Sequence, residues 1–366
     1  MKIIISGGGT GGHIFPAISI ANAVRKSIPD ADILFVGAQG KMEMEKVPDA
    51  GYEIVGLPVA GFHRQLNLRN IGRNLLFPFK LINSLYKAAA IVRRFKPDVA
   101  VGVGGYASGP VVYLAAKKGV PCLVQEQNSF PGITNRILAQ RVSKICVAYP
   151  NMERFFPKEK IILTGNPVRQ TLVSNVTREE AAAKFGLDPN RPVILVIGGS
   201  LGARSINNGI RHSLTDLTGG TQLLWQTGAF YYEAIKASLV HESHPDVKAM
   251  AFIREMDMAY AVADIVVSRA GASSISELAL LGKPAILVPS PNVSEDHQTK
   301  NALALQNQGA AIMIPDTKTD TLIKVAQEAL ADAKRLSALG DNITTFARPN
   351  AADDIAREVI ALANRK

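Results

Sequence analysis

The sequence predicts two α/β domains, each built on a parallel β-sheet, and three observations support this prediction. The chain has 366 residues, which is more than one hydrophobic core usually organises. Short apolar segments alternate with helix-like segments along its length, a pattern typical of parallel sheets covered by helices. A strand-like segment followed by a glycine-rich loop occurs near residue 7 and again near residue 198. The two halves are therefore expected to be similar.

The elements of the first half follow from apolar runs that are bounded by Gly, Pro and polar residues. Strands are expected at residues 2–5, 32–36, 52–57, 99–103, 121–125, 144–147 and 161–163. Helices are expected at residues 14–27, about 70–95, 110–117 and 133–139. The TGNPVR sequence at residues 164–169 is interpreted as a linker, because glycine and proline interrupt regular structure.

The second half repeats this alternation of strands and helices. Strands are expected at residues 193–197, 222–225, 247–252, 264–267, 285–288 and 311–314. Helices are expected at residues 204–214, 231–238, 256–262, 274–281, 298–307 and 321–331, with a last amphipathic helix at 351–363 after Pro349. Ligands of open parallel sheets bind beyond the carboxyl ends of the strands. Two such sheets facing each other would place both glycine-rich loops on one central cleft.

The composition is that of an ordinary soluble protein, with 47% hydrophobic and 20% charged residues. No apolar run reaches the roughly 18 residues of a transmembrane helix, and the N-terminal residues do not resemble a cleavable signal peptide. The two cysteines, Cys122 and Cys146, lie in apolar strand-like runs without metal-ligand spacing. We therefore expect two buried thiols in a reducing compartment.

The net charge of +10 is concentrated in the first half. Residues 1–166 contain 21 Lys and Arg against 10 Asp and Glu, whereas residues 167–366 contain 20 against 21. No acidic residue lies between Glu53 and Asp98, a region that holds eight basic residues. This asymmetry predicts an anionic partner for the first half, and both nucleic acid and an anionic membrane fit it.

The loop after the first strand, SGGGTGGHIFPA at residues 6–17, has the spacing of a dinucleotide-binding fingerprint at Gly7, Gly9 and Gly12. That fingerprint also requires an acidic residue at the end of the second strand, where this chain has VGAQ at residues 36–39. NAD and FAD are therefore disfavoured, and a purely structural turn stays an alternative. Because five glycines exceed what a turn needs and a helix start follows, we expect this loop to bind an anion such as phosphate.

His13 lies in the first turn of the helix that this loop opens. A helix N-terminus lowers the proton affinity of a histidine, which leaves a neutral imidazole able to act as a base. A capping or packing role is the alternative. A third glycine cluster, GVGGYASGP at residues 102–110, also opens a helix, and Tyr106 and Ser108 there can hydrogen-bond a ligand. The three loops together predict a diphosphate or polyphosphate ligand.

In the second half, the SRAGASSISEL sequence at residues 268–278 follows a predicted strand and opens a helix. Its small residues allow a phosphate to approach the helix start. Glu277, about one turn into that helix, can accept hydrogen bonds from a ribose diol. A polar cluster at residues 296–301 begins the next helix, where Gln298 can bind sugar hydroxyls. Helix capping accounts for part of this cluster.

Seven sequence motifs occur in one order, namely GGTGGHIFPA, GGYASGP, EQN, GNPVR, GGSLGAR, RAGASSISEL and DHQTKNA. Together they resemble the membrane-associated N-acetylglucosaminyltransferases of bacterial peptidoglycan synthesis, and they span residues 8–302. The resemblance implies an α/β fold of the GT-B type, with two Rossmann-like domains and a central cleft. It also implies the conversion of lipid I to lipid II, in which GlcNAc passes from UDP-GlcNAc to the 4-hydroxyl of MurNAc in undecaprenyl-pyrophosphoryl-MurNAc-pentapeptide.

The resemblance further implies that different parts of the chain have different functions. Residues 1–164 would form an acceptor-binding and membrane-associating domain, and residues 165–348 a UDP-GlcNAc-binding domain. Residues 349–366 would form a helix that crosses back to the first domain. The acceptor diphosphate would contact loops of the first domain, at Gly8, Gly9, His13, Gly104, Gly105, Tyr106 and Ser108.

Donor contacts are implied at positions that match the family's motifs. In that family the backbone at Ile253 would read the uracil, Glu277 would bind the ribose and residues 272–277 would hold the diphosphate. The full set implied for UDP-GlcNAc is Thr10, Gly11, Gly12, Asn128, Arg169, Ser200, Ile253, Ala272, Ser273, Ser274, Ile275, Ser276, Glu277 and Gln298.

The implied reaction is a direct, inverting attack of the acceptor's 4-hydroxyl on C1 of GlcNAc. His13 is the first candidate for the base that removes the hydroxyl proton, and Glu126 is its rival. Arg169 and the helix start at residues 271–274 would stabilise the departing diphosphate.

No cofactor and no metal ion are expected in this reaction. The DAD sequence at residues 30–32 resembles a metal motif of other sugar transferases, but it precedes a strand and is interpreted as a surface turn. The chain departs from the family at Gln125, where histidine is common, and at Leu201, where glutamine is frequent. Neither departure affects the implied core contacts.

The region without acidic residues contains an apolar cluster flanked by basic side chains. We expect it to dock on anionic lipids at the cytoplasmic face of the cell membrane, without spanning the bilayer. A core-facing helix with a solvated basic side is the alternative. The residues expected at the membrane are Leu75, Leu76, Phe77, Phe79, Lys80 and Ile82.

Other functions stay open from the sequence. Another GT-B transferase with a lipid acceptor, such as a diacylglycerol glycosyltransferase, is the nearest, and a UDP-GlcNAc epimerase shares the fold but needs neither acceptor loop nor membrane patch. A nucleic-acid-binding module would explain the charge, but the basic stretch lacks a nucleic-acid-binding motif. The expected partners are UDP-GlcNAc, lipid I and an anionic membrane surface, with cell-wall synthesis and division proteins implied by the family and no nucleic acid.

Overall fold

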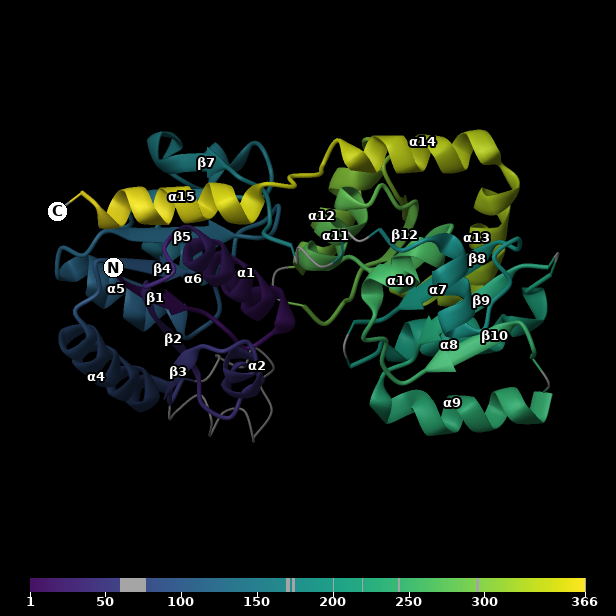
Figure 1. The fold of residues 1–366 in the computed structure, drawn as a ribbon, viewed down its shortest axis with the longest axis horizontal. Coiled ribbons are helices and arrows are strands. Elements are labelled where there is room, and N and C mark those ends of the chain that lie inside the picture. Colours follow the sequence, from purple (N-terminus) through teal and green to yellow (C-terminus); the bar gives the residue numbers. More distant parts are fainter. Residues whose placement is uncertain are drawn as a thin grey trace. The chain divides into compact units, whose positions relative to one another are not determined.

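The computed structural model describes residues 1–59, 77–168, 172, 175–199, 201–218, 220–242, 244–293 and 296–365. The chain divides into two compact units, which Figure 1 shows in sequence colours. The first unit consists of Met1–Arg169 and Arg348–Lys366, and the second of Gln170–Ala347. The end of the chain therefore belongs to the same unit as its beginning.

The first unit contains a seven-stranded parallel sheet in the order β3-β2-β1-β4-β5-β6-β7. In the centre, Ile4 of β1 lies opposite Leu34 of β2 on one side and Ala100 of β4 on the other. The strands are β1 (Lys2–Ser6), β2 (Asp32–Ala38), β3 (Glu53–Leu57), β4 (Val99–Gly102), β5 (Cys122–Glu126), β6 (Lys144–Val147) and β7 (Ile161–Leu163).

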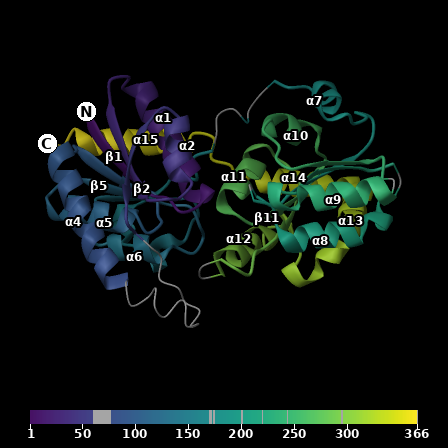
Figure 2. The ribbon, with the colours of Figure 1, turned by 90° about the horizontal axis from the view of Figure 1, so that it is seen from below.

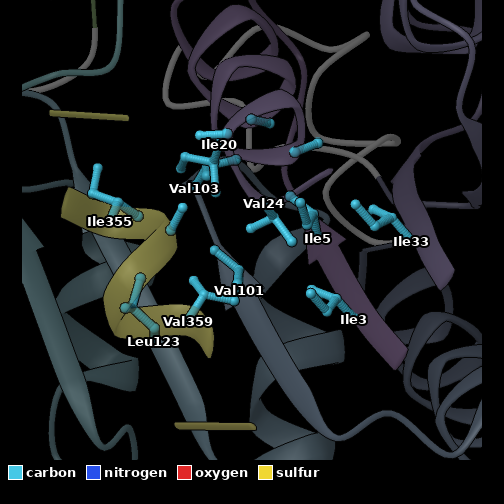
Figure 3. Packing of buried hydrophobic residues seen from close by; sticks show 14 of the residues in the cluster. Ile3, Ile5, Ile20, Val24, Ile33, Val101, Val103, Leu123, Ile355 and Val359 are labelled. Carbon is cyan, nitrogen blue, oxygen red and sulfur yellow. The ribbon is translucent and has the colours of Figure 1, made fainter. Parts of the chain in front are cut away.

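Helices cover both faces of this sheet because side chains along each strand alternate between the two faces. Ile5 belongs to the core under α1 and α15, where Val24 and Ile355 pack with it (Figure 3). Ile4 belongs to the opposite core, under α4, α5 and α6. The helices are α1 (Gly11–Ser27), α2 (Glu43–Asp49), α4 (Phe77–Phe95), α5 (Ser108–Lys117), α6 (Ile133–Leu138) and α15 (Ala351–Ala363).

The second unit contains a six-stranded parallel sheet in the order β10-β9-β8-β11-β12-β13. Its strands are β8 (Val193–Ile197), β9 (Gln222–Gln226), β10 (Val247–Met250), β11 (Ile265–Arg269), β12 (Ala285–Val288) and β13 (Ile312–Met313). One face packs against α8 and α13 (Figure 2). The core on this face contains the buried Trp225. Its helices are α7 (Arg178–Phe185), α8 (Arg204–His212), α9 (Ala229–Glu242), α10 (Met256–Val262), α11 (Ala272–Leu280), α12 (His297–Gln306), α13 (Leu322–Ala331) and α14 (Ala333–Thr344).

The strand order reverses once in each sheet, between β1 and β4 in the first unit and between β8 and β11 in the second. At such a switch point the loops after the two central strands diverge, and ligands of open α/β sheets bind there. The four loops that follow these strands are the two glycine clusters of the first unit and the two small-residue segments of the second. Each unit therefore places its two candidate loops at its own switch point.

The predicted alternation of strands and helices is confirmed, with ends that differ by one to a few residues. Helices α2, α7 and α14 were not expected. The long helix expected from about residue 70 is described from Phe77 onward, and residues 60–76 lie outside the described part. Cys122 and Cys146 are free and buried as predicted, and burial raises the pKa of each thiol to about 12. Among the described residues, no helix is both long and apolar enough to cross a membrane.

Candidate active site

A buried carboxylate that the sequence did not reveal holds the glycine-rich loop after β1. The Gly9 N–H donates to both oxygens of Glu43, each at 3.1 Å, and the Ala38 N–H donates to Glu43 Oε1 at 2.9 Å. The Glu43 residue is 1% exposed. A Cβ at Gly8, where φ is +148°, would lie 2.1 Å from Glu43 Oε1, so this position requires glycine. Helix α2 thus fixes the path of the loop.

Glu43→Ala is expected to lower the free energy of unfolding by about 3 kcal/mol, because it removes a buried carboxyl group that accepts hydrogen bonds from the Gly9 and Ala38 N–H groups. Urea denaturation of the full chain measures this change. The matched control is Glu45→Ala on the same helix, where the side chain is exposed and pairs with Lys46. An equal decrease in the free energy of unfolding in the two variants would show that the Glu43 hydrogen bonds do not stabilise the loop.

The loop after β4 lies directly against the loop after β1. A Cβ at Gly105, where φ is +81°, would lie 2.3 Å from the carbonyl oxygen of Gly8, so only glycine permits this approach. A Cβ at Gly104 would lie 2.9 Å from His13 Nε2. The Ser108 hydroxyl donates to the carbonyl of Gly105 at 3.0 Å and closes the turn that leads into α5. The predicted acceptor residues of the two loops are therefore neighbours.

His13 lies in the first turn of α1, with its ring oriented by the residue that caps this helix. Its Nδ1 is 3.1 Å from the Thr10 hydroxyl, and its backbone N–H donates to the Thr10 carbonyl at 3.1 Å. The hydroxyl can donate or accept, so it pairs with either tautomer of the imidazole. The Nε2 atom lies on the Gly104 side of the ring. Helix α1 begins at Gly11 and Gly12, and the N-terminal end of a helix suits an anion.

The Glu126 carboxylate, at the end of β5, is buried and accepts four hydrogen bonds. Oε1 accepts from the backbone and side-chain nitrogens of Asn128, at 3.0 and 3.2 Å. Oε2 accepts from the Gly132 N–H at 3.1 Å and from Asn135 Nδ2 at 2.9 Å. Burial raises the pKa of the Glu126 carboxyl above its ordinary value, and the hydrogen bonds oppose that shift. Glu126 thereby shapes the loop that carries Asn128.

Gln125 takes part in a buried polar network beside this loop. Its Nε2 donates to Asn166 Oδ1 at 2.9 Å, and its Oε1 accepts from Gln127 Nε2. Gln127 also donates to the carbonyl of Val103 at 2.9 Å. The network joins the ends of β4 and β5 to the segment after β7. The Gln125 side chain therefore hydrogen-bonds within the protein and helps to hold these segments together.

The loop after β8 in the second unit is held by contacts with the end of β9. A Cβ at Gly202 would lie 2.0 Å from the carbonyl oxygen of Thr227, which explains why glycine stands there. Gln226 Nε2 donates to the carbonyl of Gly199 at 3.1 Å, and the Ile253 N–H donates to Gln226 Oε1 at 2.9 Å. Gln226 thus joins the glycine loop to the segment predicted to read uracil. Leu201 in the same loop is exposed.

Helix α11 begins at Ala272, directly after β11, and presents small residues at its start. The Ser273 hydroxyl oxygen is buried and has no hydrogen-bond partner among the described residues. Glu277 Oε2 accepts from the hydroxyl of Tyr260, which is buried in α10, at 3.0 Å. In α12, Gln298 Oε1 accepts from the Ser290 N–H at 2.9 Å. Residues 272–277 therefore combine the start of a helix, the unpaired Ser273 hydroxyl and the Glu277 carboxylate that Tyr260 positions.

Arg269, at the end of β11, forms a polar cluster beside this helix start. Its guanidinium lies 2.5 Å from Asp316 Oδ1 and 2.7 Å from the Ser205 hydroxyl, and it also donates to the carbonyls of Val288 and Pro289. The cluster joins the carboxyl ends of β11 and β12 to the first turn of α8. The sequence did not reveal this cluster, because Arg269 begins the RAGASSISEL motif whereas its partner Asp316 lies outside every motif, 47 residues further along the chain.

The described candidate residues lie in segments that follow the carboxyl ends of strands in the two units. Gly8–His13, the loop at residues 104–108, Glu126 and Asn128 lie at that edge of the first sheet, whereas Ile253, residues 272–277 and Gln298 belong to the second unit. Arg169, Ser200, Leu75 and Leu76 lie outside the described residues, as do the side chains of Phe77 and Phe79. Within the described ranges, no cluster of three or more His, Cys, Asp or Glu side chains could hold a metal ion.

Two family models match the chain. The glycosyltransferase family 28 N-terminal domain matches residues 3–147, and the C-terminal domain of the same family matches residues 193–355. These ranges contain both switch points.

Curated relatives and solved structures match the chain over nearly its full length. The UDP-N-acetylglucosamine--N-acetylmuramyl-(pentapeptide) pyrophosphoryl-undecaprenol N-acetylglucosamine transferase of Bacteroides fragilis is 55% identical over 100% of this chain and 96% of its own length. The protein of that name from Parabacteroides distasonis is also 55% identical, over 100% and 99%. The crystal structure of Acinetobacter baumannii MurG is 27% identical, with a TM-score of 0.78 and coverage of 98% and 99%.

A further solved structure shares the fold alone. The UDP-GlcNAc 2-epimerase from Neisseria meningitidis, solved bound to UDP-GlcNAc, is 14% identical with a TM-score of 0.68 and covers 99% of this chain and 100% of its own. The GT-B fold expected from the sequence is confirmed. The full-length identity to the curated relatives decides the family: the chain is a member of the UDP-N-acetylglucosamine--N-acetylmuramyl-(pentapeptide) pyrophosphoryl-undecaprenol N-acetylglucosamine transferases, within glycosyltransferase family 28.

Proposed function

We propose that this protein transfers GlcNAc from UDP-GlcNAc to the 4-hydroxyl of MurNAc in undecaprenyl-pyrophosphoryl-MurNAc-pentapeptide, which converts lipid I to lipid II. The observation that carries this proposal is the pair of small-residue loops at each switch point, since donor and acceptor each contain a diphosphate. The names of the full-length relatives agree with it. No cofactor takes part in the proposed reaction.

The second unit binds the donor in this proposal. The diphosphate of UDP-GlcNAc contacts the start of α11, where it supplies a partner for the buried Ser273 hydroxyl. Glu277 accepts hydrogen bonds from the ribose, and the Tyr260 hydroxyl fixes the carboxylate for that role. Ile253 lies at the uracil, with its N–H held by Gln226. As the bond between C1 and the diphosphate breaks, the helix start stabilises the negative charge on UDP.

The first unit binds the acceptor. Its diphosphate contacts the loops at Gly8–His13 and at residues 104–108, where glycines without a Cβ let a ligand approach the backbone. The sugar 4-hydroxyl loses its proton to a base as its oxygen bonds to C1 of GlcNAc. UDP leaves with the electron pair of the broken C1–O bond, and the configuration at C1 inverts from α to β.

We assign the base role to His13. Its Nδ1 is paired with Thr10, and the Nε2 edge of the ring lies beside Gly104 in the second acceptor loop. Glu126 is the weaker candidate, because both of its oxygens already accept two hydrogen bonds from its own loop. Glu126 acts instead on the position of Asn128.

The proposed roles follow the expected domains, with acceptor and membrane functions in residues 1–164, donor binding in residues 165–348 and a return helix in residues 349–366. We place the protein at the cytoplasmic face of the cell membrane as a peripheral protein. Lys80 and Ile82 of α4 are exposed, which fits contact with anionic lipids there. The cell-wall synthesis and division proteins implied by the family are its proposed partners.

The experiment that tests this function measures UDP release from UDP-GlcNAc by the purified full-length chain with different acceptors. A lipid I analogue is expected to support release, whereas diacylglycerol and water are not. Without an acceptor, UDP-GlcNAc is expected to stay unchanged. Formation of UDP-ManNAc would identify an epimerase instead, and release with diacylglycerol would identify a different lipid glycosyltransferase.

A further inference from the structure

An apolar cavity of about 530 Å³ lies in the first unit, between helices α4, α5 and α6. Its volume falls within the roughly 300–1,000 Å³ typical of sites for small ligands. Leu81 and Leu85 of α4, Tyr113 of α5 and Ile137 of α6 form its walls. The exposed fraction of Leu81 is 40% and that of Ile137 is 59%, so the apolar lining is open to a ligand from outside.

The cavity is continuous with the loop that we propose for the acceptor diphosphate. Tyr106 and Gly109 belong to the segment after β4 and also line the cavity. Between them, Ser108 begins α5 and donates to the carbonyl of Gly105. A diphosphate held at residues 104–108 would therefore have an apolar cavity at its side.

The charge of the lining fits a ligand with an anionic end and an apolar body. Lys80 is the one charged residue that lines the cavity among the described residues, and its side chain is exposed. No carboxylate is part of that lining. A flexible cation beside an otherwise apolar wall suits a hydrocarbon chain joined to a phosphate.

We propose that this cavity binds the first isoprenoid units of the acceptor's polyprenyl chain, those next to the diphosphate. The proposal rests on the function proposed above and gives the acceptor site a second, apolar part. The chain leaves the diphosphate at residues 104–108 and lies along Leu81, Leu85 and Ile137. Binding of the lipid then depends on the protein surface as well as on the bilayer.

Helix α4 has one face that lines the cavity and another face that is exposed and could contact a membrane. Leu81 and Leu85 are four residues apart and share the face that lines the cavity, as do Lys80 and Ser84. Ile82 and Tyr86 share a different face, are exposed and do not line the cavity. The exposed fraction of Tyr86 is 77%. Substitutions on the two faces can therefore test chain binding and bilayer contact independently.

The experiment compares soluble acceptor analogues that carry the same MurNAc-pentapeptide diphosphate on prenyl chains of increasing length, from one isoprene unit upward. Transfer is measured with the full-length chain without vesicles or micelles. Wild-type kcat/KM for the acceptor is expected to rise about tenfold or more as the chain fills the cavity and then to level off. Leu81→Asp is expected to abolish this rise, so that kcat/KM no longer increases with the length of the prenyl chain.

Two further variants sharpen this comparison. Leu85→Trp fills the cavity with an apolar side chain and is expected to abolish the rise without introducing a charge. Tyr86→Asp carries the same new charge as Leu81→Asp on the other face of α4 and is expected to keep the full rise.

Several outcomes would overturn the inference. Equal effects of Leu81→Asp and Tyr86→Asp, or a dependence on chain length that appears only with vesicles, would assign the chain to the bilayer. An unchanged dependence on chain length in Leu81→Asp and Leu85→Trp would exclude the cavity. Normal transfer to the one-unit acceptor in the same assay would leave the proposed function intact. Absence of transfer to every acceptor would overturn that function and this inference together.

Discussion

His13→Ala is expected to lower kcat for GlcNAc transfer by about 10²- to 10³-fold, because a positioned base contributes about this much to a proton-transfer step. The Thr10 hydroxyl and the first turn of α1 fix the imidazole in the folded protein. Because the base acts on the acceptor hydroxyl, KM for UDP-GlcNAc is expected to change little. Steady-state kinetics at saturating acceptor measures both parameters.

Two comparisons separate catalysis by His13 from a structural role. His13→Gln keeps a hydrogen-bonding side chain beside Thr10 but cannot act as a base, so it is expected to be as inactive as His13→Ala and to lose the acid limb of the pH profile of kcat. His212→Ala, an exposed histidine in α8, serves as the matched control and is expected to keep wild-type kinetics. Turnover near the wild-type rate in His13→Gln would exclude the base role.

Glu277→Gln is expected to raise KM for UDP-GlcNAc by about 10- to 100-fold, because hydrogen bonds to a charged group contribute more to binding than those to a neutral amide. The kcat at saturating UDP-GlcNAc is expected to stay close to that of the wild type. The dissociation constant of UDP, measured by calorimetry, is expected to rise by the same factor.

The Tyr260 hydroxyl provides a graded test of the same contact. Tyr260→Phe leaves the Glu277 carboxylate in place but removes the donor at 3.0 Å, so it is expected to weaken UDP binding less than Glu277→Gln does. Glu233→Gln, at an exposed position in α9, is the control for loss of a negative charge. Unchanged UDP affinity in Glu277→Gln would remove Glu277 from the ribose site.

The order of the elements could be predicted because the strands are short apolar runs and glycine, proline or polar residues interrupt the chain between elements. The 193–197 and 285–288 strands have the predicted ends, since their residues are buried on both faces and bounded by breakers. Helix α7 was missed although its signal is present: Thr177 and Glu180 form a capping box at its start. Its short alanine-rich sequence has no clear apolar face.

The motifs also indicated where the loops lie, because parallel strands carry ligands at their carboxyl ends. The residues that hold the loops could not be predicted in this way. Glu43 lies in a sequence, MEMEKV, that is typical of an exposed helix. Its burial results from packing against Gly37 and against Gly8, and Gly8 is distant along the chain. Gln226 and Tyr260 likewise act through partners more than 15 residues away.

The glycosidic bond between GlcNAc and MurNAc in the isolated product most directly tests the claim that this protein transfers GlcNAc to the 4-hydroxyl of MurNAc. The full-length chain is incubated with UDP-GlcNAc and a lipid I analogue, and the disaccharide of the purified product is examined by NMR. Direct displacement of UDP by the 4-hydroxyl predicts a GlcNAc joined to MurNAc through a β linkage at O4. An α linkage, a link to another hydroxyl, or a product in which MurNAc carries no GlcNAc would contradict it.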